Sequence, residues 1–289
     1  MNLTDQKRAL ACAIAAARAA GRLLRRNLRA PKVVHTVTPH DIKLELDVRC
    51  QKLIERKLCA AFPKIALLGE EGNAGAVDAQ SRWVVDPIDG TVNFAYGIPH
   101  ACVSIALQAK SGAWRGTRDG KKTGKRPASG RVTRHTSHVT LVGVVYDPFQ
   151  NELWTAIRGQ RARLNGKPIR VSRRGKLAEA LLAMGFAKSR ENLEKSLPYF
   201  NQLARRVLKV RSLGAAALAL TYVATGRFDA YIERGISLWD IAAGGLILEC
   251  AGGEFWREPI SGRHRFRMIA SNGLLREKLV AIGNGQPWK

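Results

Sequence analysis

The chain contains no apolar run that approaches the roughly 20 residues of a membrane-spanning helix. Residues 9–20 resemble the apolar core of a signal peptide, but arginines follow at once and no small-residue cleavage site is present. The pattern instead predicts an amphipathic helix over residues 4–29, which starts at the cap residues Thr4 and Asp5. We therefore expect a cytoplasmic protein that does not associate with membranes.

Paired cysteines are also missing. The five cysteines are odd in number and form no Cys-x-x-Cys pair, which disfavours a structural zinc site. Each stands among apolar neighbours, so we expect buried free thiols in a reducing compartment.

Acidic residues are scarce, since 23 Asp and Glu stand against 48 Lys and Arg, for a net charge of +25. This charge favours a polyanionic partner: nucleic acid, an anionic membrane surface or a polyanionic substrate. Nine basic residues against one acidic residue lie between Lys110 and His138, with few apolar residues. We interpret this stretch as a long hairpin insertion, either a solvated loop without function or a weak binding site for RNA or another polyanion. Its single aromatic residue, Trp114, argues against stacking on bases.

Against this basic background, the segment Trp83–Thr91 combines a short apolar run with two carboxylates. Residues 83–85 read as a buried strand, and Pro87 predicts that the strand ends there. Asp86 and Asp89 are then presented on a turn, and Gly90 leaves backbone amides free to face an anion. Asp, Pro and Gly also favour an ordinary surface turn. The whole pattern of Asp86-Pro-Ile-Asp-Gly-Thr91 instead indicates a site where Mg²⁺ bridges carboxylates and phosphate.

Two further acidic segments occur at the ends of apolar elements. A predicted strand over residues 65–68 runs into Glu70 and Glu71, one loop before Asp86. Asp240 stands at the start of an apolar helix predicted over residues 239–251, where it is either a helix cap or a metal ligand. The other acidic strand ends favour the ligand.

The order of predicted elements indicates an α/β protein with two parts. At 289 residues the chain can form one large or two closely packed domains. We predict an α+β part over residues 1–180 and an α/β part over residues 181–289, in which helices alternate with strands. Further helices are predicted over residues 40–58, 190–207, 213–224 and 273–282. Further strands are predicted over residues 101–108, 139–146, 152–156, 181–185, 228–233, 254–256 and 268–270, with a loop over 73–81 and a tight hairpin at Asn165-Gly166.

Three segments of the chain, Gly69-Glu-Glu71, Asp86-Pro-Ile-Asp-Gly-Thr91 and Trp239-Asp-Ile-Ala-Ala-Gly244, resemble the signature segments of the inositol monophosphatase family. Supporting segments are also similar: Gly143-Val-Val-Tyr-Asp-Pro148, Leu164-Asn-Gly-Lys-Pro168 and Gly226-Arg-Phe-Asp-Ala-Tyr231. The resemblance implies a magnesium-dependent, lithium-sensitive phosphomonoesterase related to fructose-1,6-bisphosphatase. It also implies a layered αβαβα sandwich of the sugar-phosphatase type and a homodimer.

The resemblance assigns roles to residues of this chain. Two or three Mg²⁺ ions are expected per site, with Glu70, Asp86 and the Ile88 carbonyl at the first. Asp86, Asp89 and Asp240 are expected at the second. The catalytic residues would be Glu70, Thr91 and Asp47, where Asp47 pairs with Thr91 to position the attacking water. The substrate-binding residues would be Asp89, the amides of Gly90 and Thr91, and Glu233, which would contact substrate hydroxyls.

The resemblance predicts hydrolysis of inositol 1-phosphate or a similar small polyol phosphate. Alternatives in the same class are histidinol phosphate, fructose 1,6-bisphosphate and adenosine 3′,5′-bisphosphate. A different class is an RNA-binding or transcription-associated protein, in line with the charge. The chain departs from the family pattern at Leu44, where a threonine is usual, and at Ala219, where an aspartate is frequent.

Overall fold

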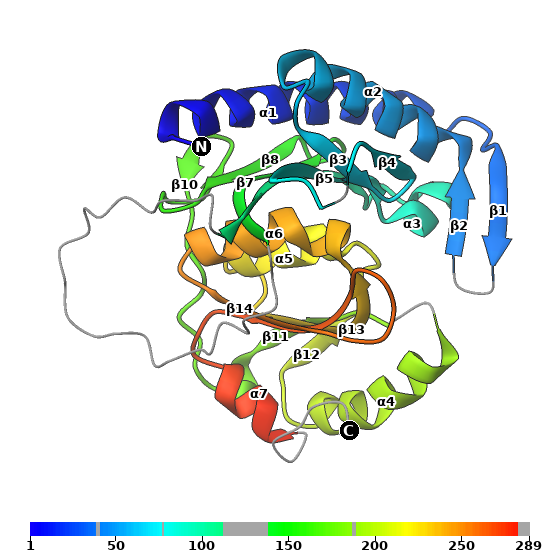
Figure 1. The fold of residues 1–289 in the computed structure, drawn as a ribbon. Coiled ribbons are helices and arrows are strands. Elements are labelled where there is room, and N and C mark those ends of the chain that lie inside the picture. Colours follow the sequence, from blue (N-terminus) through cyan, green and yellow to red (C-terminus); the bar gives the residue numbers. More distant parts are fainter. Residues whose placement is uncertain (39–40, 77, 112–137, 187–188, 283–289) are drawn as a thin grey trace.

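The computed structural model describes residues 1–38, 41–76, 78–111, 138–186 and 189–282. Its layers follow one another as helices, sheet, helices, sheet and helices (Figure 1), which confirms the predicted α/β sandwich. The first helical layer comprises α1 (Leu3–Asn27) and α2 (Glu45–Ala61), and a short hairpin of β1 (Val34–Thr38) and β2 (Asp41–Leu44) lies between them in sequence.

The first sheet has eight strands in the order β10-β9-β8-β7-β6-β5-β3-β4. All neighbours are antiparallel except β3 and β5, which run parallel. The helix α3 (Thr91–Ala95) follows β5 directly. In sequence order the strands are β3 (Ala66–Gly69), β4 (Gly72–Ala74), β5 (Ser81–Asp89), β6 (Cys102–Lys110), β7 (His138–Asp147), β8 (Glu152–Ile157), β9 (Arg163–Leu164) and β10 (Lys167–Pro168).

The second sheet has five strands in the order β12-β11-β13-β15-β14. The helices α5 (Ala216–Ala224) and α6 (Leu238–Cys250) lie between the two sheets, and α4 (Arg190–Ala204) and α7 (Arg276–Ile282) cover the outer face (Figure 1). A 3₁₀ turn at Leu177–Glu179 leads into this part. Its strands are β11 (Leu181–Met184), β12 (Lys209–Arg211), β13 (Ala230–Ser237), β14 (Glu254–Pro259) and β15 (Arg265–Ser271).

Small residues let the layers approach closely. Six of the nine buried residues of α1 are alanines and one is glycine, so the helix axis can lie near the first sheet. On the opposite face of that sheet, a Cβ at Gly143 of β7 would lie 2.8 Å from the carbonyl oxygen of Ala243 in α6. Backbone therefore packs on backbone where α6 crosses the sheet, and this contact brings the start of α6 to the ends of β5 and β6.

Several predicted boundaries were wrong for identifiable reasons. The helix predicted over residues 40–58 begins only at Glu45, because residues 41–44 pair as β2 with β1. The strand that Pro87 was expected to end continues to Asp89. Its register with β6 shifts between Asp86 and Asp89, so a bulge at Pro87-Ile88 accommodates the proline. The predicted loop 73–81 contains part of the short strand β4.

Other segments differ only at their ends. The helix predicted from residue 213 starts at Ala216, and the strand predicted over 228–233 runs on to Ser237. The Asn165-Gly166 hairpin is confirmed, since Lys167 pairs with Leu164. Lys110 and His138 are paired neighbours on β6 and β7, and the body of the predicted insertion, residues 112–137, lies outside the described residues.

Two expectations about thiols and membranes can be compared with the structure. All five cysteines are free, but only Cys50 and Cys102 are buried, while the other three are partly exposed. Among the residues that the structure describes, no helix combines the length and apolarity that a bilayer crossing requires.

Candidate active site

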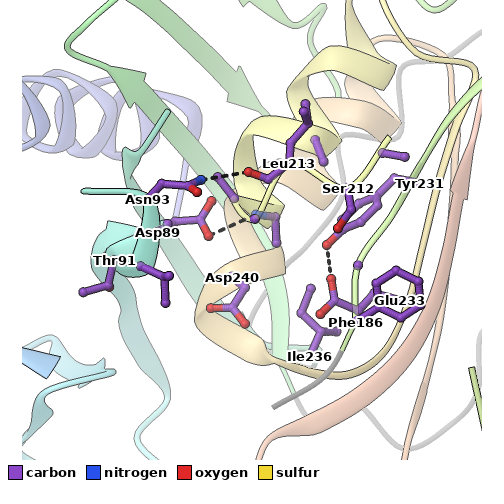
Figure 2. Close-up of a pocket in the computed structure, with 18 of the residues that line it drawn as sticks. Asp89, Thr91, Asn93, Phe186, Ser212, Leu213, Tyr231, Glu233, Ile236 and Asp240 are labelled. Atoms are coloured by element: carbon purple, nitrogen blue, oxygen red, sulfur yellow. Dashed lines mark hydrogen bonds between the residues drawn. The ribbon is translucent and has the colours of Figure 1, made fainter. Parts of the chain in front are cut away.

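A cavity of about 260 Å³ lies between the first half of the chain, which carries the eight-stranded sheet, and the second half, which carries the five-stranded sheet (Figure 2). One wall comes from the ends of β3 and β5 and the start of α3, and it carries Glu70, Asp86, Asp89 and the Gly90-Thr91 pair. The other wall comes from β11, β13, the segment before α5 and the start of α6; it is lined mainly by small and apolar residues and carries Glu233 and Asp240. Strand-end carboxylates of the first half therefore face residues from the second half.

Glu70, Asp86 and Asp240 form a carboxylate cluster at this cavity. One oxygen atom of each lies within 4.8 Å of the others, although they come from the end of β3, from β5 and from α6. Burial raises the pKa of Asp86 well above its usual range, and the nearby Glu70, Asp89 and Asp240 raise it further. Buried like charges are unfavourable unless a cation offsets them, and an all-oxygen donor set suits Mg²⁺. The residues present therefore fit a magnesium site.

Asp89 lies outside this cluster of three and faces a different partner. Its Oδ1 accepts a hydrogen bond from the Ala216 amide at 3.0 Å, and its Oδ2 accepts one from the Ala217 amide at 2.7 Å. The Cys102 thiol lies 3.5 Å from Oδ2. Burial raises the pKa of Asp89 to about 6, and the two amides oppose that shift. Asp89 thus holds the N-terminus of α5 against β5, as well as lining the cavity.

Asp47 and Asp240 occupy equivalent positions on two different helices. Each is the third residue of its helix and accepts a hydrogen bond from the amide of the residue before the helix, Leu44 in one case and Ser237 in the other. This is one half of a capping box, and it engages Oδ2 of each carboxylate. For Asp240 the cap and ligand interpretations are therefore compatible. Because Asp47 binds the Leu44 backbone, the missing threonine side chain at position 44 does not remove this bond.

Thr91 lies between the backbone carbonyl of Ile88 and the carboxylate of Asp47. Its Oγ1 lies 2.8 Å from the Ile88 carbonyl oxygen and 3.3 Å from Asp47 Oδ1. A hydroxyl has one proton, so these two acceptors compete for it. Burial raises the pKa of Asp47 to about 7, the Leu44 amide opposes the shift, and Glu70 and Glu71 reinforce it. The structure thus brings together the Thr91–Asp47 pair expected from the resemblance.

Gly90 adopts a left-handed conformation with φ of 91° at the start of α3. A Cβ there would lie 2.8 Å from the His100 carbonyl oxygen, so both conformation and space require glycine. The first amides of a helix have no acceptor within it. The amides of Gly90 and Thr91 therefore stand at a position suited to an anion, beside the carboxylate cluster.

Asn93 is a functional candidate that the sequence interpretation missed. Its Nδ2 donates to the His100 carbonyl at 2.9 Å and to the Leu213 carbonyl at 2.8 Å, which ties α3 to the opposite wall (Figure 2). The wall segment from Ser212 to Ala216 was also missed. Its only signal is the small-residue run Gly214-Ala215-Ala216, which resembles an ordinary helix start.

Glu233 lines the cavity on the second-half wall (Figure 2). The Tyr231 hydroxyl donates a hydrogen bond to Glu233 Oε2, and the carboxylate packs against the backbone of Gly185. Glu233 is thus held in position, with its carboxylate at the cavity.

The neighbouring Glu71 is excluded from the cluster by a different contact. Lys43 Nζ lies 3.2 Å from Glu71 Oε1, and the Glu71 amide donates a hydrogen bond to Gln51 Oε1. Ala219, which replaces a frequent family aspartate, lines the cavity and is 3% exposed.

Comparison with known proteins agrees with this geometry. The sequence profile of the inositol monophosphatase family matches residues 5–116 and 135–281, and so omits the middle of the basic stretch. The chain is 37% identical to "Nus factor SuhB" of Xylella fastidiosa over 97% of this chain and 98% of that protein. It is 35% identical to "Inositol monophosphatase 1" of Solanum lycopersicum over 94% of this chain and 93% of that protein. The solved inositol monophosphatase of Anabaena superposes with a TM-score of 0.77 at 32% identity, covering 96% of each chain.

Proposed function

Because the chain belongs to the inositol monophosphatase family, we propose that it is a magnesium-dependent phosphomonoesterase. Its substrate would be inositol 1-phosphate or a similar small polyol phosphate, which it would hydrolyse to the free alcohol and phosphate. The observation that carries this proposal is the convergence of Glu70, Asp86 and Asp240 within 4.8 Å beside the cavity.

Each residue has a role in the proposed reaction. Bound Mg²⁺ ions would neutralise charge on the phosphate and lower the pKa of the attacking water. Glu70, Asp86, Asp240 and the Ile88 carbonyl would hold them, and Asp89 would join them at the second site while it retains α5.

The phosphate would be received by the amides of Gly90 and Thr91 at the start of α3. The Thr91 hydroxyl would orient the water while it donates its hydrogen bond to Asp47, and Glu70 would accept a proton from that water. This arrangement uses the 3.3 Å contact between Thr91 Oγ1 and Asp47 Oδ1.

The second-half wall supports a polyol as the leaving group. Glu233 offers carboxylate oxygens that can accept hydrogen bonds from hydroxyls, and Ser212 lies on the same wall. The rest of that wall is small and apolar, which leaves room for a ring. Histidinol phosphate, fructose 1,6-bisphosphate and adenosine 3′,5′-bisphosphate are the alternative substrates.

The test is phosphate release from these four esters, with and without Mg²⁺ and with and without Li⁺. We expect one preferred ester, no activity without Mg²⁺, and inhibition by Li⁺. Glu70→Gln and Asp89→Asn should abolish turnover, while Glu71→Gln, which alters the adjacent carboxylate paired with Lys43, should retain it. Absence of activity on all four esters from folded, magnesium-loaded protein would contradict the proposal, as would full activity of Glu70→Gln.

We also propose a homodimer. Three exposed apolar side chains follow one another near the cavity: Val92 (40% exposed), Tyr96 (75%) and Ile98 (49%). Such a cluster favours a subunit contact. Light scattering should give a molar mass of two chains for the parent protein and of one chain for Tyr96→Glu.

A second candidate function is association with RNA or the transcription apparatus. It is favoured by the relative named Nus factor SuhB and by the basic stretch 110–138. Its test is RNA binding over a salt series with and without residues 112–136. Binding that does not change on deletion would exclude this stretch as an RNA-binding segment.

A further inference from the structure

The outer faces of α1 and α2 form a continuous basic surface. The two helices lie side by side over the first sheet (Figure 1). They are antiparallel, since Arg8 Nη2 donates to the Ala61 carbonyl at 3.1 Å and the Cys12 thiol lies 3.5 Å from the Lys57 carbonyl. Six of the ten exposed residues of α1 and four of the five exposed residues of α2 are basic, and none is acidic. We call these ten residues the basic face: Lys7, Arg8, Arg18, Arg22, Arg25, Arg26, Arg49, Lys52, Arg56 and Lys57.

No ion pair within the described part of the chain neutralises this face. No ion pair there involves a side chain of α1 or α2. These helices carry four acidic residues: Asp5 closes the capping box of α1, Asp47 is buried behind Thr91, and Glu45 and Glu55 are partly exposed but form none of the described ion pairs. Elsewhere on the surface basic residues do find partners, as Arg267 does with Glu258.

The local stability of the helices does not account for the pattern. Arg25 and Arg26 lie in the last turn of α1, where a cation interacts favourably with the helix dipole. Arg18 and Arg22 lie in the interior of α1 at a spacing of four residues, at which like charges destabilise a helix. Lys52 and Arg56 repeat this spacing in α2. The face therefore carries unfavourable charge that an anionic partner would offset.

The other exposed residues of α1 and α2 limit which kinds of anionic partner the basic face can bind. The exposed remainder is Leu3, Thr4, Ala11, Ala15 and Ala60. The apolar sides of both helices are buried against the sheet, so no apolar face is available for insertion into a bilayer. No exposed position of either helix carries an aromatic side chain on which a base could stack, or an Asn or Gln that could pair with adenine. A surface of Lys and Arg without these side chains favours contacts with phosphates.

We propose that the basic face binds the phosphate backbone of a nucleic-acid duplex without reading its sequence. Lys7 and Arg26 are 19 residues apart in α1, which places them about 28 Å apart along the helix axis. A duplex presents one phosphate charge per about 1.7 Å of its axis, so several phosphates can be contacted at once. No residue of α1 or α2 lines the cavity, and the site stands apart from the proposed phosphatase function.

The test compares two variants of the full-length protein with equal loss of charge. The face variant carries Arg18, Arg22, Arg25 and Arg26 each changed to Gln. The control variant carries Arg173, Arg205, Arg206 and Lys209 each changed to Gln; these are exposed residues outside α1 and α2 that form no ion pair among the described residues. Glutamine keeps the helix propensity of arginine. Thermal melting shows whether both variants are folded. Neither the melting nor the binding measurement depends on catalytic activity.

Binding of fluorescent DNA and RNA duplexes of about 24 base pairs is measured from 50 to 200 mM salt. We expect the face variant to lose at least tenfold in affinity for one or both duplexes at 100 mM salt. Its plot of log affinity against log salt should be shallower by up to about 3.6, or 0.9 per lost phosphate contact. The control variant should lose less than threefold. When both variants are made in a chain that lacks residues 112–136, the difference in affinity between them should persist.

Three outcomes would overturn the proposal. Equal losses in the two variants would mean that only net charge matters. Unchanged affinity of the face variant for both duplexes would mean that the face does not bind them. Loss of binding to phosphatidylserine vesicles with unchanged duplex affinity would assign the face to a membrane instead.

Discussion

The backbone amide of Ala217 donates a 2.7 Å hydrogen bond to Asp89 Oδ2 across 128 positions of sequence. Together with the Ala216 amide, it anchors the start of α5 on the carboxylate that ends β5. Asn93 adds a second link through the Leu213 carbonyl. The wall of the cavity that comes from the second half is therefore attached to the acidic wall by side chains of one short segment, residues 89–93.

Asn93→Ala should uncouple the two walls. It leaves the carbonyls of His100 and Leu213 without their donor, so we expect turnover to fall at least tenfold while the protein stays folded, at a cost of about 1–3 kcal/mol. Asn27→Ala is the matched control, because Asn27 also donates to a carbonyl, that of Leu23, far from the cavity. Steady-state kinetics of both variants decide the matter, and equal effects would contradict a positioning role for Asn93.

Thr91→Val should lower kcat by about 10² to 10⁴, because it removes the hydroxyl that pairs with Asp47 but keeps the shape of the side chain. Thr91→Ser keeps the hydroxyl and should lose less than about tenfold on the same reasoning. Near-normal kcat in Thr91→Val would show that this hydroxyl does not orient the water.

The stability of the metal-free protein should fall as pH rises from 5 to 8. The pKa of Asp47 is raised to about 7 and that of Asp89 to about 6 by burial. The native state thus holds protons that the unfolded chain releases near its ordinary pKa. The stabilisation that these protons contribute to the native state is complete below that ordinary pKa and is lost as pH rises through 6 and 7.

Mg²⁺ should therefore raise the melting temperature more at pH 8 than at pH 5, because protons compete with it for the same carboxylates. Burial lowers the pKa values of His100, His138 and His264, which act in the opposite direction. Asp47→Asn isolates the carboxylate effect and should flatten the metal-free profile. An equal Mg²⁺ effect at both pH values would contradict this account.

Gly185→Ala should change substrate affinity rather than chemistry. The new Cβ would collide with the Glu233 carboxylate, which must leave its place beside Tyr231. We expect KM for a polyol phosphate to rise about tenfold, while hydrolysis of p-nitrophenyl phosphate, which has no hydroxyls to bind, stays nearly constant. Gly175→Ala is the control, since its Cβ would meet nothing closer than 3.9 Å. Equal losses on both esters would exclude a selective role for Glu233.

Gly143→Ala should destabilise the whole fold by about 1–3 kcal/mol, as expected for overpacking. The added Cβ would press on the Ala243 backbone of α6, which cannot move as a flexible side chain could. Urea denaturation measures the change, again with Gly175→Ala for comparison. A variant as stable as the parent would show that α6 can shift away from the sheet.

The sequence alone determined features that depend on neighbouring residues. The carboxylates at the ends of β3 and β5, the need for glycine at position 90 and the helical faces of α1 follow from turn chemistry and periodicity. The boundary at residues 40–45 could not be obtained this way, because charge alternating with apolar residues suits both a strand and a helix there. Pairing of β2 with β1 decided it.

Only the tertiary structure decided how the residues of the site are used. Glu70 and Asp86 share a cluster with Asp240, from more than 150 positions away, because α6 packs on the first sheet at Gly143. Asp89 turns to the amides of α5, and no local pattern reveals that contact. The charges of the basic face are visible in the sequence, but the absence of ion pairs to them in the described residues is not. Which sides of α1 and α2 are exposed depends on how the two helices pack against the first sheet, and only the tertiary structure determines this packing.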